Sequence, residues 1–200
     1  MADIIKKLYG GYMSTVADTS IYTPPTGKRT VLKSMTVCNS SPTAQNFFIR
    51  LNGIDFVWSR SIKPYETLVI PVFDQVLFSG QTITVWAQTA NTIHVRLSGY
   101  DTDRTDLITF RFRATTSDIT VSSGKFLVKS IAICTAANDP ITFDMKFGSN
   151  YIICNHPLKP LDTMLIPTLD QIIESGEGIA SKVSNTNTAV FVHINAQVVT

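Results

Sequence analysis

"PVFDQVLFSG", residues 71–80, recurs in altered form as "PTLDQIIESG", residues 167–176, in a chain of 200 residues. The match extends in both directions at the same offset, with small shifts at positions where loops are expected. Identical pairs at this offset include Lys33/Lys129, Ser34/Ser130, Cys38/Cys134, Phe47/Phe143, Pro64/Pro160, Thr67/Thr163 and Ile83/Ile179. An offset larger by one residue aligns the pairs Ala17/Ala114, Lys28/Lys125, Val95/Val192 and Leu97/Ile194. A repeat of this length predicts that the chain contains the same domain twice.

Within each repeat the apolar residues alternate with a period of two. "TVLKSMTVC" (30–38) and "TIHVRLSGY" (92–100) place apolar side chains on one side of an extended chain, and the second repeat does the same in "AVFVHINAQV" (189–198). Such runs, separated by turn-forming segments, are typical of antiparallel strands. We therefore expect an all-β protein of two tandem, homologous, antiparallel β-sandwich domains, jelly-roll-like, with about six or seven strands each. The predicted parts are an N-terminal arm (1–16), a first domain (17–103) and a second domain (104–200).

The repeated motif itself favours a structural role. Pro71 and Pro167 are expected to end a strand, because proline cannot donate to a β-ladder. Asp74 and Asp170 are then placed to cap one helical or 3₁₀ turn. A catalytic pair of carboxylates would need the two side chains close together, whereas equivalent positions of two domains are usually apart.

Composition and motifs argue against most enzyme and nucleic-acid functions. The formal net charge is +2, and only 16% of the residues are charged, so no strong basic field is expected and nucleic acid is not a predicted partner. The three histidines lack metal-site spacing, and no phosphate loop, GxSxG or dinucleotide motif occurs. We predict no enzyme activity and no catalytic, cofactor-binding or metal-binding residue.

Membrane and redox signals are equally weak. The sequence contains no secretory signal and no apolar stretch near twenty residues, so no membrane partner is expected. The three cysteines show no paired spacing, which fits folding under reducing conditions. Cys38 and Cys134 occupy equivalent positions and are predicted to be small apolar core residues.

Three segments hold candidate partner-binding residues. In "DTDRTDLITFRFRAT" (101–115) the alternation places Arg111 and Arg113 on the outer face of a connecting strand, where they are either simply solvated or contact an anionic partner. Trp58 and Trp86 occur only in the first repeat; they either anchor a core or subunit contact, or stack on sugar rings. The N-terminal arm carries six apolar residues: Ile4, Ile5, Leu8, Tyr9, Tyr12 and Met13. This arm either docks on a neighbouring chain or folds back on its own domain as an edge strand.

The first repeat also resembles small tailed-bacteriophage virion proteins. The matching pieces are Ile21–Pro24, Gly27-Lys28, Lys33-Ser34, Cys38–Ser40, Pro64–Thr67 and Leu77–Ile83. The second repeat keeps Gly124-Lys125, Lys129-Ser130, Cys134-Thr135 and Ile173–Gly176, but lacks the Tyr-Thr-Pro element.

This resemblance implies a non-enzymatic structural component of a phage virion, in the tail, neck, baseplate or capsid decoration. It implies a homo-oligomer that contacts copies of itself and other virion proteins and is assembled in the host cytoplasm. The alternative from another class is a carbohydrate-binding module for host-surface recognition. Whether Trp58 and Trp86 are exposed and coplanar distinguishes the two.

Overall fold

A computed structural model describes residues 4–72, 74–117, 119–121, 124–167, 169–185 and 189–199, with the backbone alone for 119–121. These residues form strands, turns and loops, and none of them is helical. The chain divides into two compact units, Met1–Thr105 and Asp106–Thr200. The protein is therefore all-β, as the alternation of apolar residues predicts.

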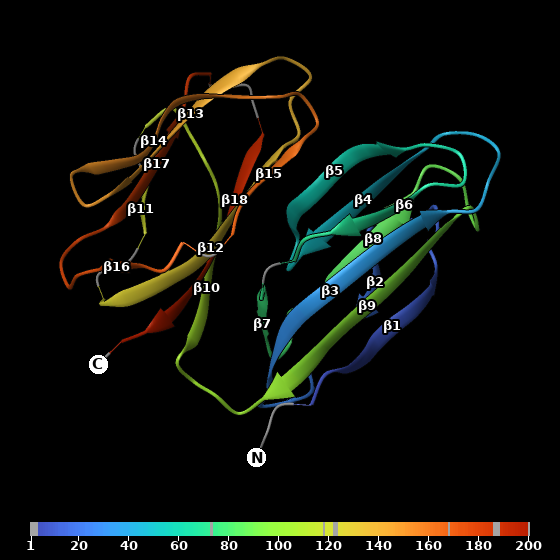
Figure 1. Ribbon diagram of the computed structural model, residues 1–200, viewed down its shortest axis with the longest axis horizontal. Helices are drawn as coiled ribbons and strands as arrows, with labels where there is room; N and C mark the ends of the chain where they lie inside the picture. Colours follow the sequence, from blue (N-terminus) through green and yellow to red (C-terminus); the bar gives the residue numbers. More distant parts are fainter. Residues whose placement is uncertain are drawn as a thin grey trace. The chain divides into compact units, whose positions relative to one another are not determined.

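Unit 1 contains two antiparallel sheets (Figure 1). One has the order β1-β9-β3-β6, with β7 also paired to β3, and the other has the order β2-β8-β4-β5. The strands are β1 (Lys6–Tyr12), β2 (Thr19–Tyr22), β3 (Arg29–Asn39), β4 (Gln45–Leu51), β5 (Ile54–Ile62), β6 (Thr67–Ile70), β7 (Val76–Phe78), β8 (Ile83–Ala87) and β9 (Ile93–Thr102).

Unit 2 repeats this arrangement strand for strand. Its sheets have the orders β10-β18-β12-β15, with β16 also paired to β12, and β11-β17-β13-β14. The strands are β10 (Leu107–Arg113), β11 (Ile119–Val121), β12 (Phe126–Thr135), β13 (Ile141–Phe147), β14 (Asn150–Leu158), β15 (Thr163–Ile166), β16 (Gln171–Ile173), β17 (Ile179–Val183) and β18 (Val190–Val198).

Both units have the strand order of a jelly roll. Without the short β7, the eight strands of unit 1 lie in the orders first-eighth-third-sixth and second-seventh-fourth-fifth, which is the two-sheet Greek-key arrangement of that fold. The described part of each unit holds nine strands, more than the six or seven expected, because three-residue strands such as β7 show no readable alternation.

The first strand of each unit comes from a segment that the sequence analysis described as an arm or as a connecting strand. Lys6–Tyr12 pair with β9, so this part of the predicted arm is an edge strand of unit 1, the second of the two arrangements left open (Figure 1). The predicted connecting strand is β10, which pairs with β18 in unit 2. Since β1 and β10 occupy the same place in the topology, the arm has a counterpart before the second repeat.

The strand registers repeat as well as the strand order. Met35 lies opposite Ile70 in unit 1, and Ile131 lies opposite Ile166 in unit 2. The third strand of each unit carries a β-bulge, between Leu32 and Ser34 and between Val128 and Ser130. Left-handed backbone conformations recur at the pairs Ser59/Asn155, Tyr65/Leu161 and Asp74/Asp170. The two units therefore share local backbone conformations as well as strand order and register.

The quoted motif has a different local role from the predicted helix cap. Asp74 has a φ of 56° and Asp170 a φ of 45°, so both are in the left-handed region that aspartate tolerates better than most residues. The Asp74 carboxylate pairs with Lys33 Nζ at 2.5 Å, and Asp170 pairs with Lys129 in the same way. Each lysine lies at the bulge of the third strand. The aspartate therefore fixes the loop after the proline to the bulge, and the prediction of a cap is wrong.

Alternation builds the core of each unit. In β4 Phe47, Ile49 and Leu51 are fully buried, and in β13 Phe143 and Met145 are. Side chains of this size each contribute about 1.5–3 kcal/mol when buried. Ile108, Phe110 and Phe112 of β10 pack against the core of unit 2, as the alternation predicts.

The cysteines follow the core prediction only in part. Cys134 is buried, but Cys38 is only half-buried on β3. Cys38 alternates with Val37 and therefore projects from the outer face of its sheet, so its assignment to the core is wrong.

Candidate functional site

The six apolar residues of the N-terminal segment do not share one environment. Ile4 is 79% exposed and Ile5 is 58% exposed, whereas Met13 is 1% exposed and belongs to the core. The Met13 side chain is covered within the chain, and its contact with a partner stays a prediction. The other members are the partly buried Leu8 and Tyr9 and the exposed Tyr12. Their contact with a neighbouring chain stays a prediction.

The two arginines predicted as partner-binding lie on β10, opposite His193 and Phe191 of β18. Arg113 is exposed and Arg111 is partly buried. Burial lowers the pKa of Arg111 to about 9. A partner for either arginine stays a prediction.

Trp58 and Trp86 meet in one cluster on the outer face of the sheet β2-β8-β4-β5. Trp86 lies opposite Phe48 in the β4–β8 ladder, and the two rings stack at 4.8 Å with 3° between their planes. Trp58 meets Trp86 edge-on, at 6.1 Å and 78°. Trp86 is 8% exposed. The two indoles are therefore neither coplanar nor jointly exposed.

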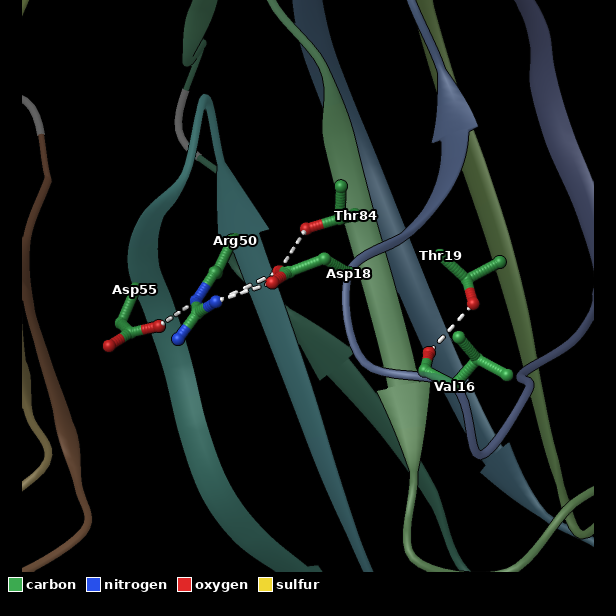
Figure 2. A network of polar contacts seen from close by, with 6 residues as sticks. All are labelled: Val16, Asp18, Thr19, Arg50, Asp55 and Thr84. Atoms are coloured by element: carbon green, nitrogen blue, oxygen red, sulfur yellow. Dashed lines mark hydrogen bonds and ion pairs between the residues drawn. The ribbon is translucent and has the colours of Figure 1, made fainter.

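Arg50 lies over the rings of Trp58 and Trp86 and also belongs to a polar network. Figure 2 shows this network, with Arg50 between Asp55 and Asp18. Its guanidinium carbon lies 5.3 Å from the Trp58 ring centroid and 5.0 Å from that of Trp86. Arg50 Nε donates to Asp55 Oδ1 at 2.5 Å, and Nη1 donates to Asp18 Oδ2 at 2.7 Å. Thr84 Oγ1 donates to Asp18 Oδ1 at 3.2 Å. One arginine thus ties the loop before β2 to the β4–β5 hairpin.

The Asp55 carboxylate is partly shielded from solvent. Burial raises the pKa of Asp55, and the Arg50 guanidinium opposes this rise without cancelling it. The network gives Arg50 a positioning role, since its guanidinium donates to the carboxylates of Asp18 and Asp55 in the same unit.

The equivalent surface of unit 2 has different chemistry. Phe48, Arg50, Trp58 and Trp86 correspond to Asp144, Lys146, Cys154 and Lys182. Lys182 Nζ lies 3.7 Å from Asp144 Oδ2, and Lys146 lies over the ring of Tyr151 at 4.6 Å. The strands of this sheet recur in unit 2, but the tryptophan cluster on its outer face is replaced by charged side chains and a tyrosine.

A second polar cluster holds β1 in unit 1. The Asp101 carboxylate accepts hydrogen bonds from Lys6 Nζ at 2.5 Å, Tyr22 Oη at 2.7 Å and Thr30 Oγ1 at 2.6 Å. Burial would raise the pKa of Asp101, but these donors lower it below its ordinary value. Burial and the neighbouring carboxylate raise the pKa of Tyr22 to about 12. Asp101 therefore joins strands of both sheets.

The other sheet of unit 1 has a hollow on its outer face that the sequence did not indicate. Its volume is about 390 Å³. It lies over β1, β9 and β3 and is lined by Lys7, Gly10, Gly11, Thr36, Cys38, His94, Val95 and Arg96. Of these residues, only Cys38 was singled out from the sequence. Lys7 and Arg96 become neighbours only because β1 pairs with β9, and the sequence did not predict this pairing.

Within the described ranges, no three His, Cys, Asp or Glu side chains gather closely enough to hold a metal ion. The same residues include no helix of the length and apolarity needed to cross a membrane.

Comparisons with known proteins give matches in structure alone. No family model matches the sequence, and no curated protein matches it either. Among solved structures, the major capsid protein of bacteriophage PM2 matches with a TM-score of 0.41 and 11% identity, over 100% of this chain and 98% of that one.

Two further solved structures have lower TM-scores. The STIV MCP matches with a TM-score of 0.36 and 11% identity, over 99% of this chain and 97% of that one. The tandem CBM22 domains of Paenibacillus barcinonensis Xyn10C match with a TM-score of 0.26 and 8% identity, over 94% of this chain and 85% of that one. All three scores lie under 0.5, so these similarities carry no argument about function.

Proposed function

We propose that this chain is a non-enzymatic structural protein of a bacteriophage virion, in the tail, neck, baseplate or capsid decoration. In this role it contacts copies of itself and other virion proteins after assembly in the host cytoplasm. The resemblance of the first repeat to small tailed-phage virion proteins supports the class of particle.

The proposal rests on one observation: the two units have the same backbone arrangement but different side chains on their outer faces. The bulge, the Lys33–Asp74 pair and the strand registers recur in unit 2. At the equivalent positions, the tryptophan cluster around Arg50 is replaced by the Lys182–Asp144 ion pair and by the contact of Lys146 with the Tyr151 ring. A subunit that meets different neighbours through its two domains needs this combination of stiffness and divergent surface. A single-site enzyme gains nothing from duplicating its scaffold.

The alternative, a carbohydrate-binding module, has less support. A platform for sugar rings requires tryptophan faces that are open to solvent. Here the Trp86 ring is stacked on Phe48 and nearly buried, and Trp58 stands almost perpendicular to it. We therefore expect no sugar binding by this pair.

The test is the composition of the purified particle. Phage from an infected culture is banded in a density gradient, and the chain is quantified by mass spectrometry across the fractions. We expect it to co-sediment with infectivity at a fixed ratio to the other structural proteins. Its absence from the banded particles, or a ratio that varies between fractions, would contradict the proposal.

A further inference from the structure

The outer face of the sheet β1-β9-β3-β6 carries a regular grid of side chains. In one row Gly10, Arg96 and Thr36 lie opposite one another across β1, β9 and β3. In the next row the neighbours are Tyr12, His94 and Cys38, and in a third row Lys7 lies opposite Ser98, which lies opposite Ser34. The Tyr12 ring lies 3.6 Å from that of His94. We call the surface formed by Lys7, Gly10, Thr36, Cys38, His94 and Arg96 the cationic face.

The positive charges of this face form no ion pair with the residues that the structure describes. Lys7 and Arg96 are exposed, and no carboxylate of the described residues forms an ion pair with either. Their neighbours behave differently, since Lys6 pairs with Asp101 and Lys33 with Asp74. The cationic face therefore presents two uncompensated cations on one side of a flat sheet.

Glycine keeps the hollow between these cations open. A Cβ added at Gly10 would meet only Lys7 Cδ, at 3.7 Å, so a side chain fits there without strain. The corresponding position in unit 2 has one: Gly10 lies opposite Arg96, and Arg111 lies opposite His193 at the equivalent site. The absence of a side chain at Gly10 is therefore not required by the fold of the strand.

The spacing of the two cations matches an extended polypeptide. Lys7 of β1 lies opposite Ser98, and Arg96 lies two residues from Ser98 on β9, so the two cations are diagonal neighbours on adjacent strands. Such neighbours are about 7–8 Å apart, close to the distance of about 7 Å between side chains on the same face of one strand. Carboxylates at alternate positions of an extended chain therefore have a matching spacing.

We propose that the cationic face binds an acidic, extended segment of a partner polypeptide. Its alternate carboxylates pair with Lys7 and Arg96, and its backbone lies in the hollow over Gly10. The inference deepens the proposed function by giving the chemistry of one partner, and it rests on that function for the partner being a virion protein.

The test uses the purified full-length chain and a fluorescein-labelled ten-residue peptide of alternating Glu and Thr. Binding is followed by fluorescence anisotropy at low salt. Lys7→Glu with Arg96→Glu is expected to weaken binding about tenfold or more, because two ion pairs become repulsive. Gly10→Val changes no charge and is expected to weaken binding about fivefold by filling the hollow.

The matched control is Lys63→Glu with Lys159→Glu, which alters the net charge equally at two exposed lysines elsewhere. It is expected to bind within about twofold of the unaltered chain, and a peptide with Gln for Glu is expected not to bind. Circular dichroism confirms that each variant is folded. The proposal is overturned if the control loses as much affinity as Lys7→Glu with Arg96→Glu, if Gly10→Val binds normally, or if equimolar inorganic phosphate or an anionic oligosaccharide displaces the peptide.

This measurement is independent of where the protein resides. A chain that binds the peptide at the cationic face but is missing from particles would refute the proposed function and leave the surface intact. If the chain is present in particles but its cationic face binds no acidic peptide, the proposed function stands and the proposed binding surface is refuted.

Discussion

Lys33 and Asp74 show how single residues set the geometry of both units. The aspartate adopts a left-handed backbone conformation and holds the bulge lysine of the third strand, and Asp170 and Lys129 repeat the arrangement. The sequence contained both pairs as identities, yet their contact was not predicted, because the partners lie 41 residues apart along the chain. A local motif indicates a turn but not which distant strand it is tied to.

The Asp74 site yields a prediction that separates backbone strain from charge. Asp74→Asn keeps a residue that tolerates positive φ and loses only an exposed ion pair, so it should cost less than about 1 kcal/mol. Asp74→Val adds a β-branched residue in the left-handed region and should cost about 1–3 kcal/mol. Urea unfolding measures both. Equal losses for the two variants would show that the conformation does not matter.

Asp101 leads to a prediction of how the stability of unit 1 depends on pH. Its pKa is lowered in the folded state, so its contribution to stability is present above the ordinary value near 4 and is lost as the pH falls through the lower, folded value. Asp101→Asn should therefore reduce the free energy of unfolding at pH 7 by about 1–3 kcal/mol. The variant should also lose less stability than the unaltered chain below about pH 4. Denaturant titrations from pH 2 to 7 test this, and parallel curves for the two proteins would refute it.

At the scale of the strands, alternation predicted the inner face of each sheet but not its edges. In "TIHVRLSGY" Ile93, Val95 and Leu97 were placed correctly because one face of β9 is fully buried. The strands β1 and β10 were read as an arm and a connector, since the first contains two glycines and the second lies between the repeats. An edge strand is defined by its pairing partner, and the local sequence does not carry that information.

The close approach of β9 to β3 leads to a prediction at Gly99 of β9. A Cβ at this position would lie 2.3 Å from the carbonyl oxygen of Val31, so the backbone itself would have to move. Gly99→Ala should destabilise unit 1 by about 2–4 kcal/mol. The equivalent residue of unit 2 is Ala196, which is buried without such a conflict, and Ala196→Gly should cost only about 1 kcal/mol. Thermal unfolding of the two variants compares them, and an unaltered midpoint for Gly99→Ala would contradict the geometry.

At the scale of the whole molecule, the repeat predicted two copies of one fold, and the two sheets of each unit have the same order. The candidate surfaces were less accessible to prediction. Trp58 and Trp86 could be singled out as residues present in one repeat, but their perpendicular packing and the role of Arg50 depend on three strands meeting. The cationic face was missed altogether, because Lys7 and Arg96 become neighbours only through the β1–β9 pairing.

Two separate cores imply two folding units. Fragments 1–105 and 106–200 should each be soluble and show a strand-type circular dichroism spectrum with a cooperative thermal transition. Each fragment has the length of a small domain, and its core residues come from its own strands. A fragment without a cooperative transition would mean that the two units do not fold independently.

The central claim is that a duplicated jelly roll serves as a structural subunit of a phage particle. The most direct measurement is a cryo-electron microscopy map of the purified virion at a resolution that separates strands. The account predicts symmetric density into which both β-sandwiches fit, with their unlike outer faces against different neighbours. A map that other proteins explain completely, with no such pair of sandwiches, would contradict it.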